Sequence, residues 1–240
     1  MPESLLKRSP TCRILSVAAM QILVVGSVTA VCARPHPKVC AEFFKSDSVF
    51  VGTVVAQTAV INKEGYDGWV YRLRVRKVYR GPTQDFIEVY TENTSGRFPL
   101  DTGETYLLFA YTFEKRFTIT CGGNSAKLSE AGDALRQLED LMKRLKSSTD
   151  GEVSGVVDEF VGMNQPAVPG VLVTVRGGGK RYQGVTGKDG WFHITVPPGI
   201  YVVSAHSSKL HVIPYDLSYD DPEHIVVHKC GCTAIQFIAR

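Results

Sequence analysis

The stretch GVTGKDGWFHITVPPGIYVV, residues 184–203, carries the strongest fold signal in the chain. A strand-like run stops at Lys188-Asp189-Gly190, a turn sequence whose glycine adopts positive φ at no steric cost. A second run covers 191–196, and Pro197-Pro198-Gly199 separates it from a third run at 201–203. Because proline removes a hydrogen-bond donor from a central strand, the proline pair marks a turn or an edge. Three runs separated by two turns predict a meander, the unit of an all-β sandwich.

Similar short runs on both sides of this stretch predict a mainly β protein. At 71–76, apolar residues alternate with arginines, as in a strand with one buried and one solvated face. Residues 61–69 are typical of a loop or a hairpin tip. The other predicted strands are 47–57, 86–91, 105–111, 116–121, 153–157, 170–175, 182–186, 200–205 and 225–227.

One segment has helical periodicity. Its apolar residues recur at steps of three and four: Leu128, Ala131, Leu135, Leu138, Met142 and Leu145. We expect this helix to pack on the preceding sheet; a coiled coil, for which the stripe is short, is the alternative. The polar linker 147–151 follows, so the sequence predicts one unit at 40–146 and a second unit at 152–240.

Residues 1–33 have the pattern of a signal peptide. Basic residues precede an uncharged apolar run at 14–33, and Val31 and Ala33 occupy the positions before an expected cleavage site. An uncleaved anchor is the alternative, because about 20 apolar residues can span a bilayer. In both cases we expect the body outside the cytoplasm, whether secreted, periplasmic or membrane-anchored.

The charge balance argues against nucleic acid as a partner. The chain has 27 basic and 24 acidic residues, a formal net charge of +3, and removal of residues 1–33 lowers it to +1 because they hold three basic residues and one acidic residue. No excess of positive charge then remains for nucleic acid. Contact with a membrane is expected only if the leader is uncleaved.

The second half resembles the carboxypeptidase regulatory-like family. The resemblance rests on VSGVVDE at 153–159, PGVLVTV at 169–175 and GKDGWFHITVPPGIYVVSA at 187–205, in which turn, aromatic residues, proline pair and tyrosine follow the family's order. It implies a transthyretin-like β-sandwich. It also implies a non-catalytic module that packs against other domains or is displayed with them.

The first half resembles the netrin-like domains, which include the tissue inhibitors of metalloproteinases. The matching segments are SDSVFVGTVV at 46–55, YRLRVRKVYRG at 71–81 and GETYLLFAY at 103–111, followed by Cys121 and the helix. The resemblance implies an OB-type five-stranded barrel with a C-terminal helix.

The same resemblance implies metalloprotease inhibition as an alternative function. In the inhibitors, a Cys-x-Cys at the start of the mature protein places an amino group and a carbonyl on the protease zinc. Here that start reads Cys40-Ala41-Glu42, and cleavage after Ala33 would leave six residues ahead of Cys40. Cys40, Ala41 and Glu42 are therefore candidate partner-binding residues.

Cys40, Cys121, Cys230 and Cys232 follow the leader and suggest at least one disulfide. Cys40 and Cys121 bracket the first unit, and a bridge between them would stabilise it by roughly 4 kcal/mol in the chain-entropy model. This is the predicted pair. Cys230 and Cys232 are an alternative pair, although an extended spacing of about 6.6 Å is at the outer limit for a disulfide.

His228, Cys230 and Cys232, with His224, share one parity and would lie on one face of a strand. An unbroken strand would separate His224 from Cys232 by about 26 Å, too far for one metal ion. A metal or redox role needs the chain to fold between them and is our third hypothesis. A glycine bulge at Gly231 is the preferred interpretation.

Arg72, Arg74 and Arg76 form an outward row that could meet an anionic partner. The preferred interpretation is a solvated sheet face, balanced by the acidic residues at 85, 88 and 92. Asn93-Thr94-Ser95 fits a glycosylation acceptor. His193 lies in a predicted strand and is interpreted as a sandwich residue.

We find no zinc-protease helix motif, nucleophile elbow or phosphate loop in the sequence. We therefore expect a non-catalytic protein without a cofactor. The predicted function is that of an exported binding or structural protein that presents its surface to a protein or glycan partner outside the cytoplasm.

Overall fold

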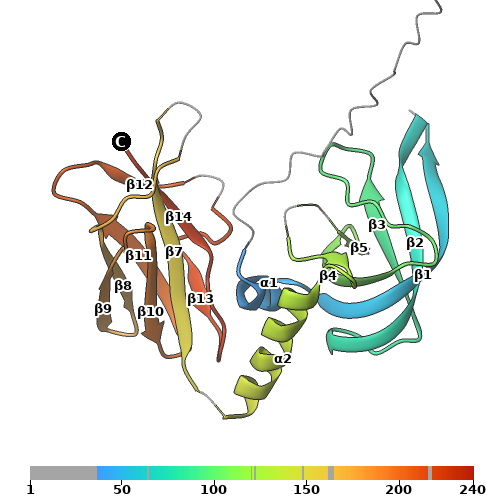
Figure 1. Cartoon of the computed structure of the whole chain (residues 1–240), viewed down its shortest axis with the longest axis horizontal. Helices are drawn as coiled ribbons and strands as arrows, with labels where there is room; N and C mark the ends of the chain where they lie inside the picture. Colours follow the sequence, from blue (N-terminus) through green and yellow to red (C-terminus); the bar gives the residue numbers. More distant parts are fainter. Residues whose placement is uncertain are drawn as a thin grey trace, which may run out of the picture.

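The computed structural model describes residues 37–240, except 64, 120, 122, 148, 162–164 and 216–217. The predicted leader lies outside the described residues. Over the described residues the protein is mainly β, as predicted, with two short helices, α1 (Val39–Lys45) and α2 (Gly132–Ser147) (Figure 1). Within the described part of the chain, neither helix has the length and apolar character needed to cross a membrane.

The first half forms one six-stranded sheet. Strand β1 pairs with β2 along its length and with β4 through Ser48–Thr53. The order is β1-β2-β3-β5-β4-β6, and β3 and β5 run parallel. The strands are β1 (Ser48–Asn62), β2 (Gly65–Arg80), β3 (Phe86–Glu92), β4 (Thr105–Phe113), β5 (Arg116–Thr118) and β6 (Ala126–Lys127).

The first part of β1, residues 48–52, is buried on both faces, which explains its apolar sequence, whereas Val55 and Ile61 further along are exposed. Phe50 and Val54 lie in a cluster formed with the neighbouring strands. Val49 and Val51 lie in a second cluster, into which α1 and α2 pack. The predicted packing of the helix on the preceding sheet is therefore confirmed.

The helix α2 begins at Gly132, after the first residues of the predicted stripe. Leu138 is fully buried as expected, and so is Leu141, which the prediction did not include. Helix α1 was not predicted, because seven residues are too few to establish a helical period.

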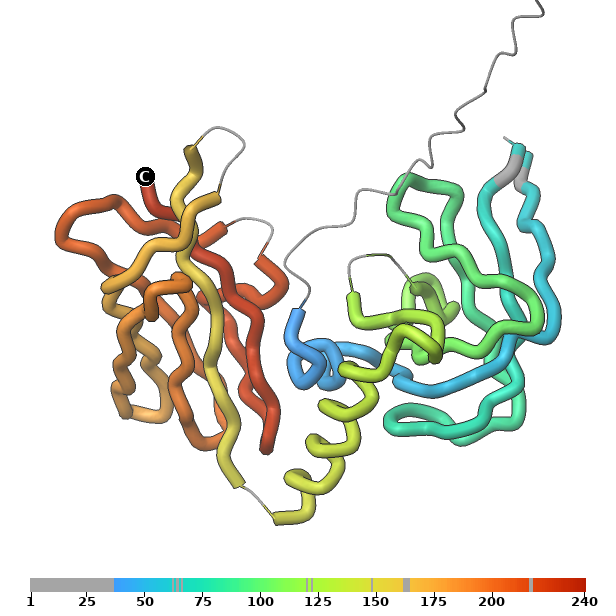
Figure 2. Tube along the Cα trace, viewed as in Figure 1, coloured from blue at the N-terminus to red at the C-terminus, as the bar shows by residue number. Residues whose placement is uncertain are grey.

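The second half forms two four-stranded sheets with the orders β10-β7-β14-β12 and β13-β11-β8-β9. The sheets enclose one apolar cluster drawn from residues 153–239, a sandwich-like arrangement (Figure 2). The strands are β7 (Gly151–Glu159), β8 (Leu172–Gly177), β9 (Lys180–Val185), β10 (Trp191–Val196), β11 (Gly199–His206), β12 (Val212–Pro214), β13 (Ile225–Val227) and β14 (Ile235–Ala239).

The predicted meander is wrong. The turn at Gly190 has φ +75° as expected, but β10 and β11 lie in different sheets. The chain crosses between the sheets at Pro197-Pro198, which cannot donate ladder hydrogen bonds. The Tyr201 hydroxyl donates to the Pro197 carbonyl oxygen at 2.7 Å and fixes this crossing.

Strand β7 has no room for a side chain at Gly155. A substitution at this position therefore tests how closely β7 packs against β14 in the sandwich. A Cβ there would lie 2.2 Å from the Ile235 carbonyl oxygen on β14 and 2.8 Å from the Phe192 ring. We expect Gly155→Ala to lower the free energy of unfolding by about 1–3 kcal/mol, measured by urea denaturation.

Gly132→Ala is the matched control. It adds the same methyl group at the start of α2, where the nearest atom would lie 3.9 Å away. We expect it to stay within about 1 kcal/mol of the wild type. Equal effects of the two substitutions would contradict the close β7–β14 contact.

Candidate functional site

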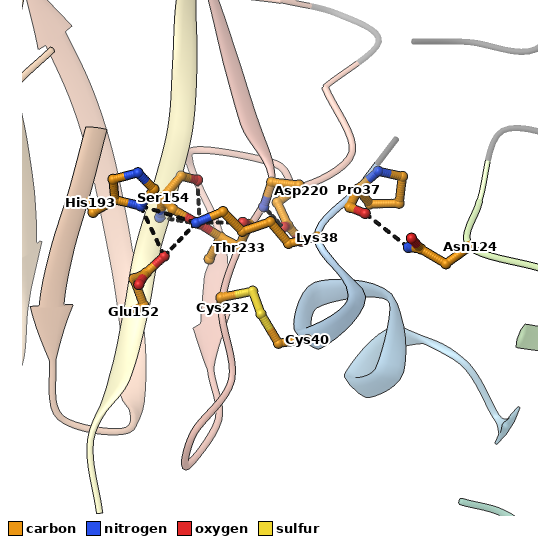
Figure 3. Close-up of a disulfide and its surroundings, with 11 residues drawn as sticks. Pro37, Lys38, Cys40, Asn124, Glu152, Ser154, His193, Asp220, Cys232 and Thr233 are labelled. Atoms are coloured by element: carbon orange, nitrogen blue, oxygen red, sulfur yellow. Dashed lines mark hydrogen bonds and ion pairs between the residues drawn. A yellow bond between two sulfur atoms is a disulfide. The ribbon is translucent and has the colours of Figure 1, made fainter. Parts of the chain in front are cut away.

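Helix α1 lies between the two halves of the molecule, and a disulfide joins it to the second half (Figures 1 and 3). Cys40 on α1 is bonded to Cys232, with a Cα–Cα distance of 5.5 Å. We call the contacts of residues 37–46 with the second half the junction.

This disulfide corrects both predicted pairings. Cys40 does not pair with Cys121, which is itself disulfide-bonded, and Cys232 does not pair with Cys230. The two bonded cysteines are separated by 192 residues. Arguments from sequence spacing could not place them together, because the unpredicted helix α1 carries Cys40 to the second half.

Two lysines that flank Cys40 form ion pairs across the junction. The Lys38 ammonium lies 2.7 Å from Glu152 Oε1, and the Lys45 ammonium lies 2.8 Å from Asp220 Oδ1. Figure 3 shows Lys38 beside both Glu152 and His193, whose Nδ1 lies 3.1 Å from Glu152 Oε1. The first half thus presents positive charge to acidic side chains of the second.

The Lys38 and His193 contacts determine the ionisation of Glu152. Burial alone would raise the pKa of Glu152, but the bonds from Lys38 and His193 outweigh burial and lower the pKa below its ordinary value. The carboxylate therefore stays charged. The interpretation of His193 as an ordinary sandwich residue overlooked its place in the junction.

A buried carboxylate organises the centre of the junction. Glu42 is 1 % exposed. It accepts hydrogen bonds from the Tyr111 hydroxyl at 2.9 Å and from the backbone and side-chain nitrogens of Asn124, both at 2.6 Å. These bonds offset the cost of removing the carboxyl group from water.

The network continues into the second half through two tyrosines. The hydroxyls of Tyr111 and Tyr219 lie 3.0 Å apart, and burial raises the pKa of each. The Lys45 ammonium lies 4.2 Å from the centre of the Tyr219 ring. Glu42 is thereby linked through hydrogen bonds to a residue of the second half.

An aromatic contact completes the junction. The His228 ring stacks on Phe44 of α1 with centroids 4.6 Å apart, and the Arg80 guanidinium lies 5.9 Å from the same Phe44 ring. Burial, and then the charge of Arg80, lower the pKa of His228. The neutral imidazole is therefore the form that fits the junction.

The structure leaves Ala41 and Glu42 closed to a partner, and Cys40 is bonded within the chain rather than free at a terminus. Ala41 is 3 % and Glu42 is 1 % exposed, and Cys40 is held by its disulfide. These residues hold the molecule together internally. This corrects their interpretation as a surface that binds a partner.

The metal hypothesis for His228, Cys230 and Cys232 is also corrected. The Cys232 sulfur is bonded to Cys40, His228 stacks on Phe44, and Cys230 is buried in the cluster beside the helices. The described residues contain no group of three or more His, Cys, Asp or Glu side chains arranged to hold a metal ion.

The predicted arginine row lies on the first sheet, as expected. Arg72, Arg74 and Arg76 are exposed. The Arg72 guanidinium lies 4.4 Å from the centre of the Phe86 ring, and Arg72 faces Glu88 across the β2–β3 ladder. Binding of an anionic partner by this row stays a prediction.

Asn93 and Thr94, from the glycosylation motif, line a polar cleft of about 310 Å³ with Asp67 and Tyr90. The Tyr90 hydroxyl donates to Asp67 Oδ2 at 2.8 Å. Burial and this bond raise the pKa of Tyr90 to about 12. The Tyr90 hydroxyl therefore stays protonated and hydrogen-bonded to Asp67.

The sheet β13-β11-β8-β9 has an exposed outer surface, which we call the open face. Its apolar members are well exposed, with Ile200 at 60 %, Val185 at 58 % and Val202 at 50 %. The four strands contain no aspartate or glutamate. The outward residues are Leu172, Thr174, Arg176, Arg181, Gln183, Val185, Ile200, Val202, Ser204, His206 and Val226.

Sequence analysis did not identify the open face. The apolar residues Ile200, Val202 and Val226 could have indicated it, because they alternate with the residues that face the core. A single strand does not show which parity faces the core when both are apolar.

The Glu42 network predicts a large loss of stability on substitution. Glu42→Ala leaves the buried Tyr111 hydroxyl and the Asn124 nitrogens without this acceptor. We expect a decrease in the free energy of unfolding of about 1–3 kcal/mol, measured by urea denaturation.

Glu139→Ala is the control for Glu42→Ala. Glu139 pairs with Lys77 at 3.2 Å, but both side chains are more than half exposed. Such a pair contributes about 0–1 kcal/mol. A loss for Glu42→Ala no larger than that for Glu139→Ala would contradict the role of Glu42.

The lowered pKa of His228 predicts a pH dependence of stability. Because the folded-state pKa lies below the unfolded value, near the ordinary 6.5, the unfolded chain binds the proton more tightly. The stability that the neutral His228 contributes is therefore fully present above pH 6.5. It is lost as the pH falls through 6.5 towards the folded-state pKa.

We expect His228→Phe, which keeps a ring against Phe44 but cannot be protonated, to lose less stability between pH 7.5 and 5 than the wild type. The urea midpoint at each pH measures this. An unchanged slope in His228→Phe would refute the assignment.

No protein-family model matches the chain, and no curated protein matches it as a relative. The resemblances to carboxypeptidase regulatory-like and netrin-like domains therefore stay predictions, and the function is argued from the junction and the open face.

Proposed function

We propose that this is an exported, non-catalytic binding protein that holds two β units in a fixed arrangement and presents the open face to an acidic protein partner. The observation that carries the proposal is the junction. A disulfide, two ion pairs and the Glu42 network hold the two halves together. A protein that acts through its surface benefits from this rigidity, because less freedom is lost on binding.

The strand pairings support finer assignments of the two units. The pairings run from β1 through β2, β3, β5 and β4 and return to β1, the order expected of an OB-type five-stranded barrel. Two four-stranded sheets around one core are consistent with a transthyretin-like sandwich. Both assignments are part of the proposal.

The disulfides support an oxidising location. Cys40 and Cys232 are bonded to each other, and Cys121 is also disulfide-bonded. Bonds of this kind persist in secreted and periplasmic proteins and are rare in the cytosol. We therefore place the protein outside the cytoplasm.

The positive charge of the open face indicates the class of partner that would bind there. Arg176 and Arg181 face each other across the β8–β9 ladder, and no acidic side chain of these strands balances them. A second copy of the same face would bring these arginines towards like charges. A partner with carboxylates and aliphatic side chains matches both the charge and the apolar residues.

A protein fits this face better than a glycan does. The outward side chains of the open face include no phenylalanine, tyrosine or tryptophan ring on which a sugar could stack. Tyr182 and Tyr201 belong to the same strands but pack against the sandwich core. The exposed aliphatic residues instead suit the side chains of a protein partner.

Site-specific photo-crosslinking tests the proposal. With p-benzoylphenylalanine in place of Gln183, an exposed residue of the edge strand β9 on the open face, we expect a crosslink to a protein in cells that make the chain. The same group in place of Thr195, an exposed residue of the opposite sheet, should give none.

The captured protein supports the proposal only if its affinity depends on the open face. We expect Arg176→Glu with Arg181→Glu to weaken binding about tenfold or more. Lys115→Glu with Lys146→Glu, the same charge change at exposed sites of the first unit, should leave the affinity unchanged. Crosslinks only from position 195, or to a second copy or a glycan, would refute the assignment.

A further inference from the structure

The disulfide of the junction borders an open cleft. Cys40 lines a cleft of about 480 Å³ together with Gln137, Asp140, Lys143 and Arg144 of α2. Cys40 and Cys232 are both only partly buried. A small molecule in the cleft would therefore lie against the disulfide-bonded Cys40.

The cleft carries more positive than negative charge. The Lys143 ammonium lies 3.1 Å from Asp140 Oδ1, but both side chains are more than two-thirds exposed, so water weakens this pair. Arg144 forms no ion pair with any described residue. The two cations and one carboxylate leave a net positive charge beside the disulfide.

Positive charge favours thiol–disulfide exchange at such a position. The attacking species is a thiolate, and nearby cations stabilise both it and the thiolate that leaves. Cations also attract an anionic reactant and raise its local concentration. A thiol that carries a carboxylate is therefore the reactant that the cleft suits.

We infer that this cleft is a site of thiol–disulfide exchange, at which a small anionic thiol reduces the Cys40–Cys232 bond. Its thiolate attacks Cys40 Sγ, a mixed disulfide forms on Cys40, and the Cys232 thiolate leaves and takes a proton from water. A second thiolate attacks the small-molecule sulfur of the mixed disulfide and releases Cys40 as a thiolate, which is protonated.

The reaction balances as a two-electron exchange. The protein disulfide is reduced to two thiols, and two molecules of the small thiol are oxidised to their disulfide. The junction then keeps its ion pairs and the Glu42 network but loses its covalent bond. Reduction would thus change how firmly the two units are held without removing their other contacts.

The full-length native protein and three thiols test this inference. The probes are 3-mercaptopropionate, which is anionic, 2-mercaptoethanol, which is neutral, and cysteamine, which is cationic. Alkylation and mass spectrometry follow Cys40 and Cys232, and rate constants are expressed per thiolate. We expect the anionic probe to react fastest, and its advantage to shrink with added salt.

The cleft charges are tested by Lys143→Glu with Arg144→Glu. We expect the rate ratio of the anionic to the neutral probe to fall about tenfold. Arg136→Glu with Lys146→Glu makes the same charge change elsewhere on α2 and should leave the ratio unchanged.

Three outcomes would overturn the inference. The first is alkylation of Cys40 and Cys232 only after the protein is unfolded. The second is a set of wild-type rate constants that do not depend on the charge of the probe. The third is an equal change of the rate ratio in both double variants. The salt dependence of the wild-type ratio decides the question even if the cleft variant does not fold.

Discussion

The burial of Glu42 is the constraint on which the arrangement of the two halves depends. A carboxyl group at 1 % exposure needs hydrogen-bond partners, and Tyr111 and Asn124 donate to Glu42. These donors belong to the first half, so the bonds of Glu42 hold α1 against the first half. Cys40 and Lys38, on and beside the same helix, are then directed at the second half.

The two halves have separate apolar clusters, so the contact between them is mainly polar. The sandwich cluster takes its members only from residues 153–239, while the two clusters of the first half add only Cys230 from beyond the linker. Polar contacts between units contribute little net free energy, because each group was already solvated. The Cys40–Cys232 bond is what makes such a contact persistent.

Sequence periodicity was sufficient to predict most strands and α2, because the buried face of each element is visible within a few residues of sequence. It failed wherever the partner lies far along the chain. Lys38 and Glu152 are 114 residues apart, and the two cysteines of the disulfide are 192 apart. The prediction of a meander was wrong for a related reason. Pro197-Pro198 does mark a turn, but a turn does not determine whether the next strand joins the same sheet.

The two outer faces of the sandwich differ in how they are covered. On the sheet β10-β7-β14-β12, Gln236 and Ile238 point away from the core yet are at most 9 % exposed. Asp220 Oδ2 and Ser218 Oγ accept hydrogen bonds from the backbone nitrogens of Ala234 and Gln236. Lys45 pairs with Asp220, and Lys38 pairs with Glu152 on β7. The open face has the opposite character, with arginines and no carboxylates on its strands. The basic flanks of α1 therefore dock on only one of the two faces, and the other face is left for a partner of negative charge.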